Sequence, residues 1–185
     1  MNNFKIVFIS ISLAIVFNVG YGQFPIGQYF EPTGYTYMIW VKILAYSYYQ
    51  GLISFMNNKV SRLDAIEMYT EILTGKLKVS AYEGYNQKFL LSSSDVLPIG
   101  EWVHITVTSG SQNIEVYINS NKIGSFTSSR STGQTQYNYI GLGPYAGYTE
   151  SQATFDEFKI FNRKLNLQEI FIEMNKIQPF DIILN

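Results

Sequence analysis

Beyond its N-terminal segment, the chain alternates between apolar and polar side chains in many short stretches. Residues 35–43, YTYMIWVKI, place one apolar set on a single face: Tyr35, Tyr37, Ile39 and Val41. Residues 77–81 and 103–107 repeat this period of two, with Leu, Val, Ile and Ala at every second position. A period of two is typical of a β-strand that buries one face.

Further short apolar or alternating stretches follow the same pattern: 51–56, 65–72, 88–93, 114–118, 122–126, 137–143 and 153–161. Asn119 and Ser120 separate two of them, and asparagine tolerates the positive φ of a tight hairpin turn. About ten short strands separated by turns favour an all-β fold, an antiparallel two-sheet sandwich.

One stretch near the C-terminus has a helical period instead. In residues 166–174, NLQEIFIEM, the apolar residues are Leu167, Ile170, Phe171 and Met174, which fall on one helical face. Asn166 and Glu169 have the spacing of a capping box. We therefore expect one short C-terminal helix with an apolar face.

Residues 155–170, FDEFKIFNRKLNLQEI, resemble the closing motif of the laminin-G-like, concanavalin A-like jelly-roll domains. Residues 35–43 resemble the early Trp strand of that family, residues 98–125 its central hairpin, and residues 139–143 its Ile-Gly strand. The resemblance implies a jelly-roll sandwich. It also implies structural roles for Trp40, Trp102, Asp156, Glu157, Arg163, Leu165 and Ile170.

Within this motif the residue types suggest specific roles. Three phenylalanines spaced by three cannot share one face of a regular strand, so a bulge or a bend is expected near Asp156 and Glu157. We expect Arg163 to donate to backbone carbonyls or to Asp156. Leu165 and Ile170 are expected to plug the open end of the core.

Residues 1–22 have the pattern of a secretory signal peptide. Lys5 precedes an apolar run at residues 6–17, and Gly20 and Gly22 stand at −3 and −1 before the next residue. An uncleaved membrane anchor is the alternative, but the run is shorter than the roughly 20 residues of a spanning helix. We expect cleavage after Gly22, secretion to the extracellular space, and one laminin-G-like domain over residues 23–185.

Composition narrows the classes of function. The formal net charge is −1, so a basic surface for nucleic acid is not supported. The chain has no cysteine, which excludes thiolate zinc sites and a cysteine nucleophile. His104 is the one histidine, and the sequence has no serine motif of the nucleophile-elbow type that could form a catalytic triad with it. We therefore expect a structural role for His104.

The segment EMYTE suggests one enzymatic alternative. Some glycan hydrolases of the jelly-roll fold carry Glu-x-Asp-x-Glu on one strand, and Glu67 and Glu71 match the two outer positions of that pattern. Tyr69 stands where the central Asp would be. We therefore expect no enzymatic activity, with hydrolysis by Glu67 and Glu71 as the alternative.

Tyrosines gather in two segments that the pattern assigns to loops, and aromatic rings stack on sugar faces. The candidate ligand-binding residues are Tyr46, Tyr48, Tyr49, Tyr145 and Tyr148. Related domains also bind Ca²⁺ through rim-loop carboxylates, and Asp64 is the one acid that we nominate. We expect a secreted, non-catalytic binding module for a glycan or an extracellular protein. A structural or adhesion protein is a further alternative.

Overall fold

The computed structural model describes residues 22–24, 34–48, 50–56, 66–71, 73–83, 87–110, 113–127, 137–142 and 150–179. Within these ranges the chain forms two antiparallel β-sheets and one helix, α1 (Leu167–Lys176). The six-stranded sheet has the order β1 (Gly22–Phe24), β10 (Tyr137–Ile140), β3 (Gln50–Met56), β4 (Ile66–Thr70), β5 (Lys76–Glu83) and β6 (Gln87–Val96). The five-stranded sheet has the order β11 (Ala153–Phe161), β2 (Gly34–Ile43), β7 (Trp102–Gly110), β8 (Asn113–Ile118) and β9 (Asn121–Thr127).

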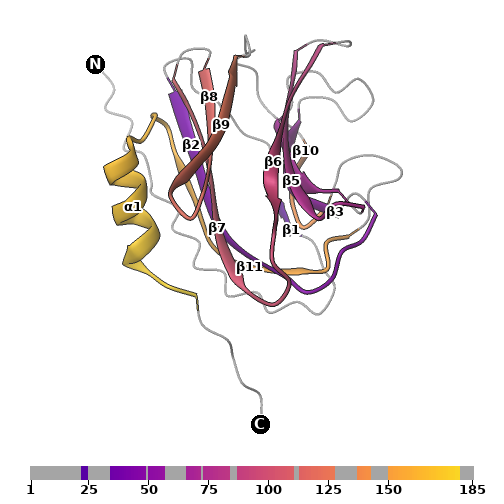
Figure 1. The fold of residues 1–185 in the computed structure, drawn as a ribbon. Helices are drawn as coiled ribbons and strands as arrows, with labels where there is room; N and C mark the ends of the chain where they lie inside the picture. Colours follow the sequence, from indigo (N-terminus) through magenta and orange to yellow (C-terminus); the bar gives the residue numbers. More distant parts are fainter. Residues whose placement is uncertain are drawn as a thin grey trace, which may run out of the picture.

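The two sheets face each other, with the core between them (Figure 1). The inner positions of β2 and β7 are the alternating residues that the sequence pattern selected, among them Tyr37, Ile39 and Ile105. They pack against β3, β4 and β5, where Phe55 and Met68 are fully or almost fully buried. The all-β, two-sheet sandwich predicted from the sequence is confirmed.

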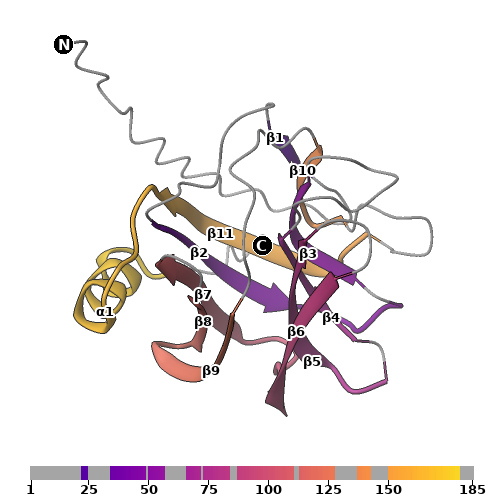
Figure 2. The same ribbon diagram turned by 90° about the horizontal axis from the view of Figure 1, so that it is seen from above.

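Helix α1 lies on the outer face of the five-stranded sheet, away from the other sheet (Figures 1 and 2). Leu165 and Ile170 form a second apolar cluster there with Met38 and Tyr117, and this cluster is separate from the main core. Both residues are buried, but the expectation that they plug the end of the core is wrong. Met38 explains the difference, because it points outward from β2 and provides an apolar surface for the helix.

Three local predictions agree with the structure, two from the closing motif and one from the β8–β9 hairpin. Asn166 and Glu169 form a reciprocal capping box at the start of α1. The ladder between β11 and β2 shifts register between Asp156 and Lys159, and Glu157 has φ +48°, which is the expected bulge. The β8–β9 hairpin turns with positive φ at both of its central residues, Asn119 and Ser120.

At one edge of the six-stranded sheet, the three-residue strand β1 pairs with β10. Residues 1–21, which hold nearly all of the predicted signal peptide, lie outside the described part of the chain. In the part that is described, no helix has the length and apolarity needed to cross a membrane.

Candidate functional site

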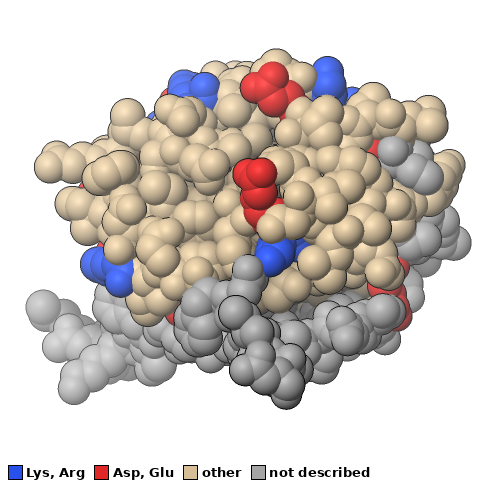
Figure 3. Space-filling model, turned by 60° about the horizontal axis from the view of Figure 1, so that its bottom comes forward, with Lys and Arg blue, Asp and Glu red and all other residues tan. Residues whose placement is uncertain are grey.

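The loops at one end of the sandwich carry a group of exposed apolar side chains. We call this group the loop-end surface; its members and their exposed fractions are Leu44 44%, Tyr48 52%, Leu73 91%, Val96 48% and Ile99 51%. They come from the β2–β3 loop, the β4–β5 turn and the β6–β7 connection. The β2–β3 and β6–β7 connections lie at the bottom of Figure 1. Figure 3 brings that end forward and shows a mostly uncharged face with a few separate charged groups.

Backbone contacts hold these three segments against one another. Ile43 and Ile99 form an isolated β-bridge, and the Gly100 amide donates to the Ile43 carbonyl over 2.7 Å. The Leu97 amide donates to the Gly75 carbonyl over 3.0 Å. The loop-end surface is therefore assembled on a fixed backbone.

Tyr46 ties the β2–β3 loop to its two neighbours. Its hydroxyl donates to the Leu97 carbonyl, and its ring lies against Gly75. Gly75 has φ +60°, and a Cβ there would lie 2.6 Å from Tyr46 Cζ and 2.7 Å from Val96 Cγ1. Burial raises the pKa of the Tyr46 hydroxyl. Tyr46 was predicted to contact ligand; in the structure its hydroxyl and ring hold the β2–β3 loop against the two neighbouring segments.

The two ends of the β2–β3 loop are also anchored. Gln50 is fully buried, and its Oε1 accepts from the Gln152 amide over 3.0 Å and from Ser47 Oγ over 3.3 Å. The Gln152 carbonyl accepts from the amides of Leu44, over 2.8 Å, and Ala45, over 3.3 Å. Residues 44, 45, 47 and 50 of this segment are therefore tied to Gln152 or to one another, and Tyr48 lies between these attachments.

Of the five tyrosines predicted to bind ligand, Tyr48 is the one that the structure places at the exposed loop end. Tyr49, Tyr145 and Tyr148 lie outside the described residues. The four aliphatic members of the loop-end surface were not predicted from the sequence. Apolar residues at strand ends give no separate signal in the alternating pattern, because the same residue types fill the core.

The two acids of the hydrolase alternative differ in accessibility. Glu67 is 1% exposed, on the face of β4 opposite the core, and its Oε2 accepts from Ser80 Oγ over 3.4 Å. Glu71 is partly exposed; its Oε2 lies 3.5 Å from Lys78 Nζ and accepts from Thr74 Oγ1 over 2.9 Å. A retaining mechanism needs two carboxyls about 5–5.5 Å apart that both reach one glycosidic bond. An enclosed Glu67 does not meet that requirement.

His104 is enclosed on the outer face of the five-stranded sheet. Its ring meets the Trp40 ring edge-on at 5.0 Å between centroids, and its Nδ1 lies 3.3 Å from Thr106 Oγ1. Burial, with a smaller contribution from the nearby Lys159 charge, lowers the pKa of His104 to about 3. A histidine that is neutral and 2% exposed is suited to packing rather than to proton transfer with a ligand.

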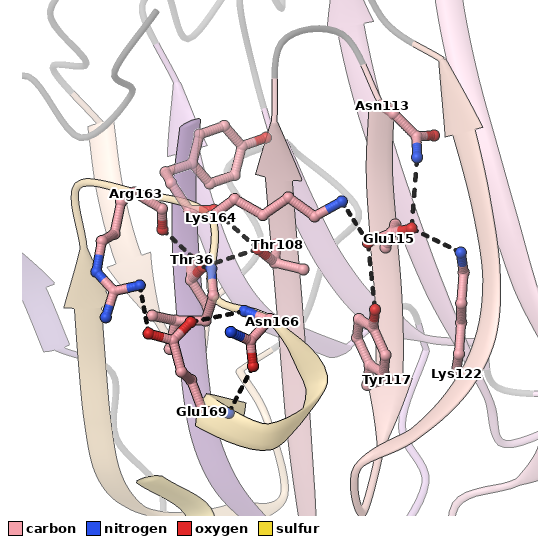
Figure 4. A network of polar contacts seen from close by, with 12 residues as sticks. Thr36, Thr108, Asn113, Glu115, Tyr117, Lys122, Arg163, Lys164, Asn166 and Glu169 are labelled. Carbon is pink, nitrogen blue, oxygen red and sulfur yellow. Dashed lines mark hydrogen bonds and ion pairs between the residues drawn. The ribbon is translucent and has the colours of Figure 1, made fainter. Parts of the chain in front are cut away.

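The closing motif is held to the sheet by a buried hydroxyl pair (Figure 4). Thr36 Oγ1 donates to the Arg163 carbonyl over 2.9 Å, accepts from the Leu165 amide over 3.0 Å, and lies 2.8 Å from Thr108 Oγ1. The Arg163 side chain does not use its predicted partners. Its Nη1 lies 2.7 Å from Glu169 Oε1, because the bulge at Asp156 turns that carboxylate back to accept from the Glu157 amide.

Glu115 forms a second attachment on the same face (Figure 4). Lys164 Nζ lies 2.6 Å from its Oε2, Lys122 Nζ donates to its Oε1 over 2.7 Å, and the Tyr117 hydroxyl donates to its Oε2 over 3.2 Å. Burial acts in the opposite direction, but the hydrogen bonds from Lys122 and Lys164 lower the pKa of Glu115 to about 2. Burial, together with the Glu115 charge, raises the pKa of Tyr117 to about 12. These polar groups pair with one another, which indicates a structural role.

Among the described residues, no group of three or more His, Cys, Asp or Glu side chains is placed to hold a metal ion. Asp64, the residue nominated for Ca²⁺, lies outside the described ranges. Trp102 is partly buried in β7, next to Lys42 of β2 in the ladder. Glu157 is buried, with Lys159 Nζ 3.7 Å from its Oε2.

Solved structures share this fold at low sequence identity. Domain 4 of an extracellular arabinanase from Geobacillus stearothermophilus, in complex with arabinotriose, matches with a TM-score of 0.68 and 18% identity over 82% of this chain and 70% of that chain. A heptameric pentraxin from Limulus polyphemus matches with a TM-score of 0.56 and 15% identity over 80% and 70%. A structure of botulinum neurotoxin type C, whose cell entry depends on two ganglioside molecules, matches with a TM-score of 0.60 and 14% identity over 80% of this chain and 36% of that chain.

The search among curated protein sequences gave no match. The sequence model of the concanavalin A-like lectin/glucanase superfamily matches residues 18–171, which is most of the chain. The strands of both sheets lie within the matched residues. The chain therefore belongs to the concanavalin A-like lectin/glucanase superfamily.

Proposed function

We propose that this chain is a secreted, non-catalytic binding module that recognises a glycan through its loop end, with Tyr48 as the ring on which a sugar stacks. The observation that carries the proposal is the exposed Tyr48 ring on an otherwise anchored loop. The fold supports it, since solved structures of this fold include one in complex with arabinotriose.

The β2–β3 loop is preorganised, and this favours binding. A tyrosine ring offers an apolar face to the C–H face of a sugar, together with a hydroxyl for hydrogen bonding. Ordering a flexible loop would cost free energy on binding, so a loop that is already held loses less. Tyr46 and Gln50 hold the β2–β3 loop in this way before any ligand arrives.

A glycan array with the purified secreted protein tests this proposal. Wild type should bind a defined set of neutral glycans, and Tyr48→Ala should lose that signal. Ile172→Ala, at an exposed position on α1, is the matched control and should bind like wild type. Parallel arrays with Ca²⁺ and with a chelator determine whether the ion is required. A wild-type array without signal, or a signal that Tyr48→Ala retains, would contradict the proposal.

The non-catalytic part of the proposal is tested separately. The enclosed Glu67 and the Tyr69 at the central position of the EMYTE segment motivate it. Incubation with arabinan, galactan and β-glucans should release no reducing ends. Hydrolysis that Glu67→Gln abolishes would establish the alternative, a glycan hydrolase.

Secretion is inferred from the order of Lys5, the apolar run and the Gly-x-Gly sequence that ends at Gly22. N-terminal sequencing of the protein from culture medium should begin at Gln23. Recovery of the full-length chain in the membrane fraction would contradict this part of the proposal.

A further inference from the structure

The loop-end surface differs from a surface that binds only sugar. Four of its five members are aliphatic: Leu44, Leu73, Val96 and Ile99. Aliphatic side chains neither donate nor accept hydrogen bonds, so a hydroxyl pressed against them loses its bonds to water without replacement. The part of a ligand that lies over these four residues is therefore expected to be apolar.

The segments that carry the aliphatic side chains are in contact with the β2–β3 loop, which carries Tyr48. The Tyr46 ring, two residues before Tyr48, lies close to the position of Val96 Cγ1 and to the turn that carries Leu73. Leu44 directly follows Ile43, which forms a β-bridge with Ile99, so Leu44 and Ile99 belong to neighbouring segments. Because these segments lie against the loop that carries Tyr48, we expect a ligand on Tyr48 to extend over aliphatic side chains of the adjoining segments.

Charged residues near this surface indicate the charge of the ligand that it would bind. Asp95 and Glu101 are exposed and stand beside Val96 and Ile99 along the chain. The basic residues of the same segments, Lys42 and Lys76, are partly buried. Acidic side chains at the margin repel an anionic ligand, so a neutral one is favoured.

We infer that the loop end binds a neutral sugar that carries a short aliphatic group, with the sugar on Tyr48 and the aliphatic group over Leu73, Val96 and Ile99. This inference rests on the proposed function and names the class of ligand for the same site. The exposed side chains form an open surface at the loop tips, which suits a short aliphatic group better than a long chain.

The test compares methyl, butyl and hexyl glycosides of two neutral sugars, β-D-glucopyranose and α-L-arabinofuranose, by NMR titration below any micelle concentration. Burial of one methylene contributes up to roughly a fourfold change in affinity, so partial burial of five should make a hexyl glycoside at least about tenfold tighter than the methyl glycoside. The double variant Leu73→Ser, Ile99→Ser should reduce this hexyl-to-methyl ratio to about one. Ile172→Ser, on α1, should keep the ratio.

The possible failures are distinguishable. If methyl and hexyl glycosides bind equally tightly and Tyr48→Ala abolishes both, the inference is wrong and the proposed function stands. If neither series binds wild type although the glycan array gives a signal that Tyr48→Ala loses, the inference is wrong and the proposed function stands. If Tyr48→Ala leaves binding intact, both are wrong. If the protein binds vesicles of phosphatidylcholine with a neutral glycolipid but not the soluble hexyl glycosides, the short-group inference is also wrong.

Discussion

The helix-covered face and the loop end of this domain differ in the solvent exposure of the apolar side chains compared here. Under α1, Leu165 and Ile170 are fully or almost fully buried against Met38 of β2. At the loop end, Leu73 is 91% exposed, and Tyr48 is half exposed. The contact between α1 and the sheet removes these side chains from water, although Leu167, Phe171 and Ile172 on the outer side of the helix are exposed. The loop end has no covering element among the described residues, and its apolar members are in contact with water.

Polar groups show the same contrast. The closing motif is bound to the sheet through Thr36, and Lys164 reaches across to Glu115. At the loop end, hydrogen bonds from Tyr46 and from the backbone hold the loops to one another, while the Tyr48 ring and four aliphatic side chains are exposed. We conclude that the helix-covered face stabilises the fold, while the loop end is the exposed surface that we propose for contact with a ligand.

The largest expected effect is on the helix-covered face. Ile170→Ala leaves a cavity between α1 and the sheet, and such truncations typically cost about 2–5 kcal/mol. Urea unfolding should show a clearly lower midpoint for this variant. Tyr48→Ala is the paired control at the loop end and should stay within about 0.5 kcal/mol of wild type. Equal losses for the two variants would remove the distinction between the regions.

Acid should weaken the helix-covered face in two steps. The pKa of His104 falls from 6.5 to about 3 on folding. Its contribution to the free energy of unfolding is therefore complete above pH 6.5 and is lost as the pH falls toward 3. The pKa of Glu115 falls from 4.5 to about 2, so its contribution is complete above pH 4.5 and is lost as the pH falls toward 2. Both shifts make the unfolded chain the better proton acceptor.

Urea unfolding at pH 7, 5 and 3.5 measures these steps. His104→Gln should remove much of the loss between pH 7 and 5, because glutamine does not titrate. Glu115→Gln should keep that loss and reduce the one below pH 4.5. If His104→Gln shows the same pH dependence as wild type, protonation of this ring is not linked to unfolding.

A smaller effect is expected where the loop end is held together. Gly75→Ala places a Cβ at φ +60°, 2.6 Å from Tyr46 Cζ, so the Tyr46 ring has to move. Strain of this kind typically costs about 1–3 kcal/mol. Hydrogen exchange should increase in residues 44–48 and 95–100 and stay at the wild-type level in α1. Faster exchange in α1 as well would show that the two regions are coupled.

The contrast also separates what the sequence predicts from what it does not. Alternation in β2 assigned Tyr37 and Ile39 to the core correctly, because burial of one face sets a period of two. The same rule placed Met38 on the outer face, but no pattern within β2 says whether another element covers that face. For this reason the burial of Leu165 and Ile170 was anticipated, while the surface that they cover was not.

The loop end shows a second limit. Tyrosines in loops drew attention to Tyr46 and Tyr48 alike, yet one is pinned and the other is exposed. The difference depends on Gly75, which is distant from Tyr46 in the sequence. Because glycine has no Cβ, the Tyr46 ring can pack directly against its backbone. Contacts between distant loops depend on the folded backbone, so a periodic pattern within one segment cannot report them.

An NMR titration of the wild-type protein with a glycan selected on the array tests the central claim most directly. Backbone amide shifts should change in residues 44–48, 73–76 and 95–101, and those of α1 should stay constant. Tyr48→Ala should abolish the changes while its spectrum retains the dispersion of the folded protein. Shift changes centred on β4 and β5 around Glu67, with the loop end unaffected, would contradict the claim that the loop end is the binding site.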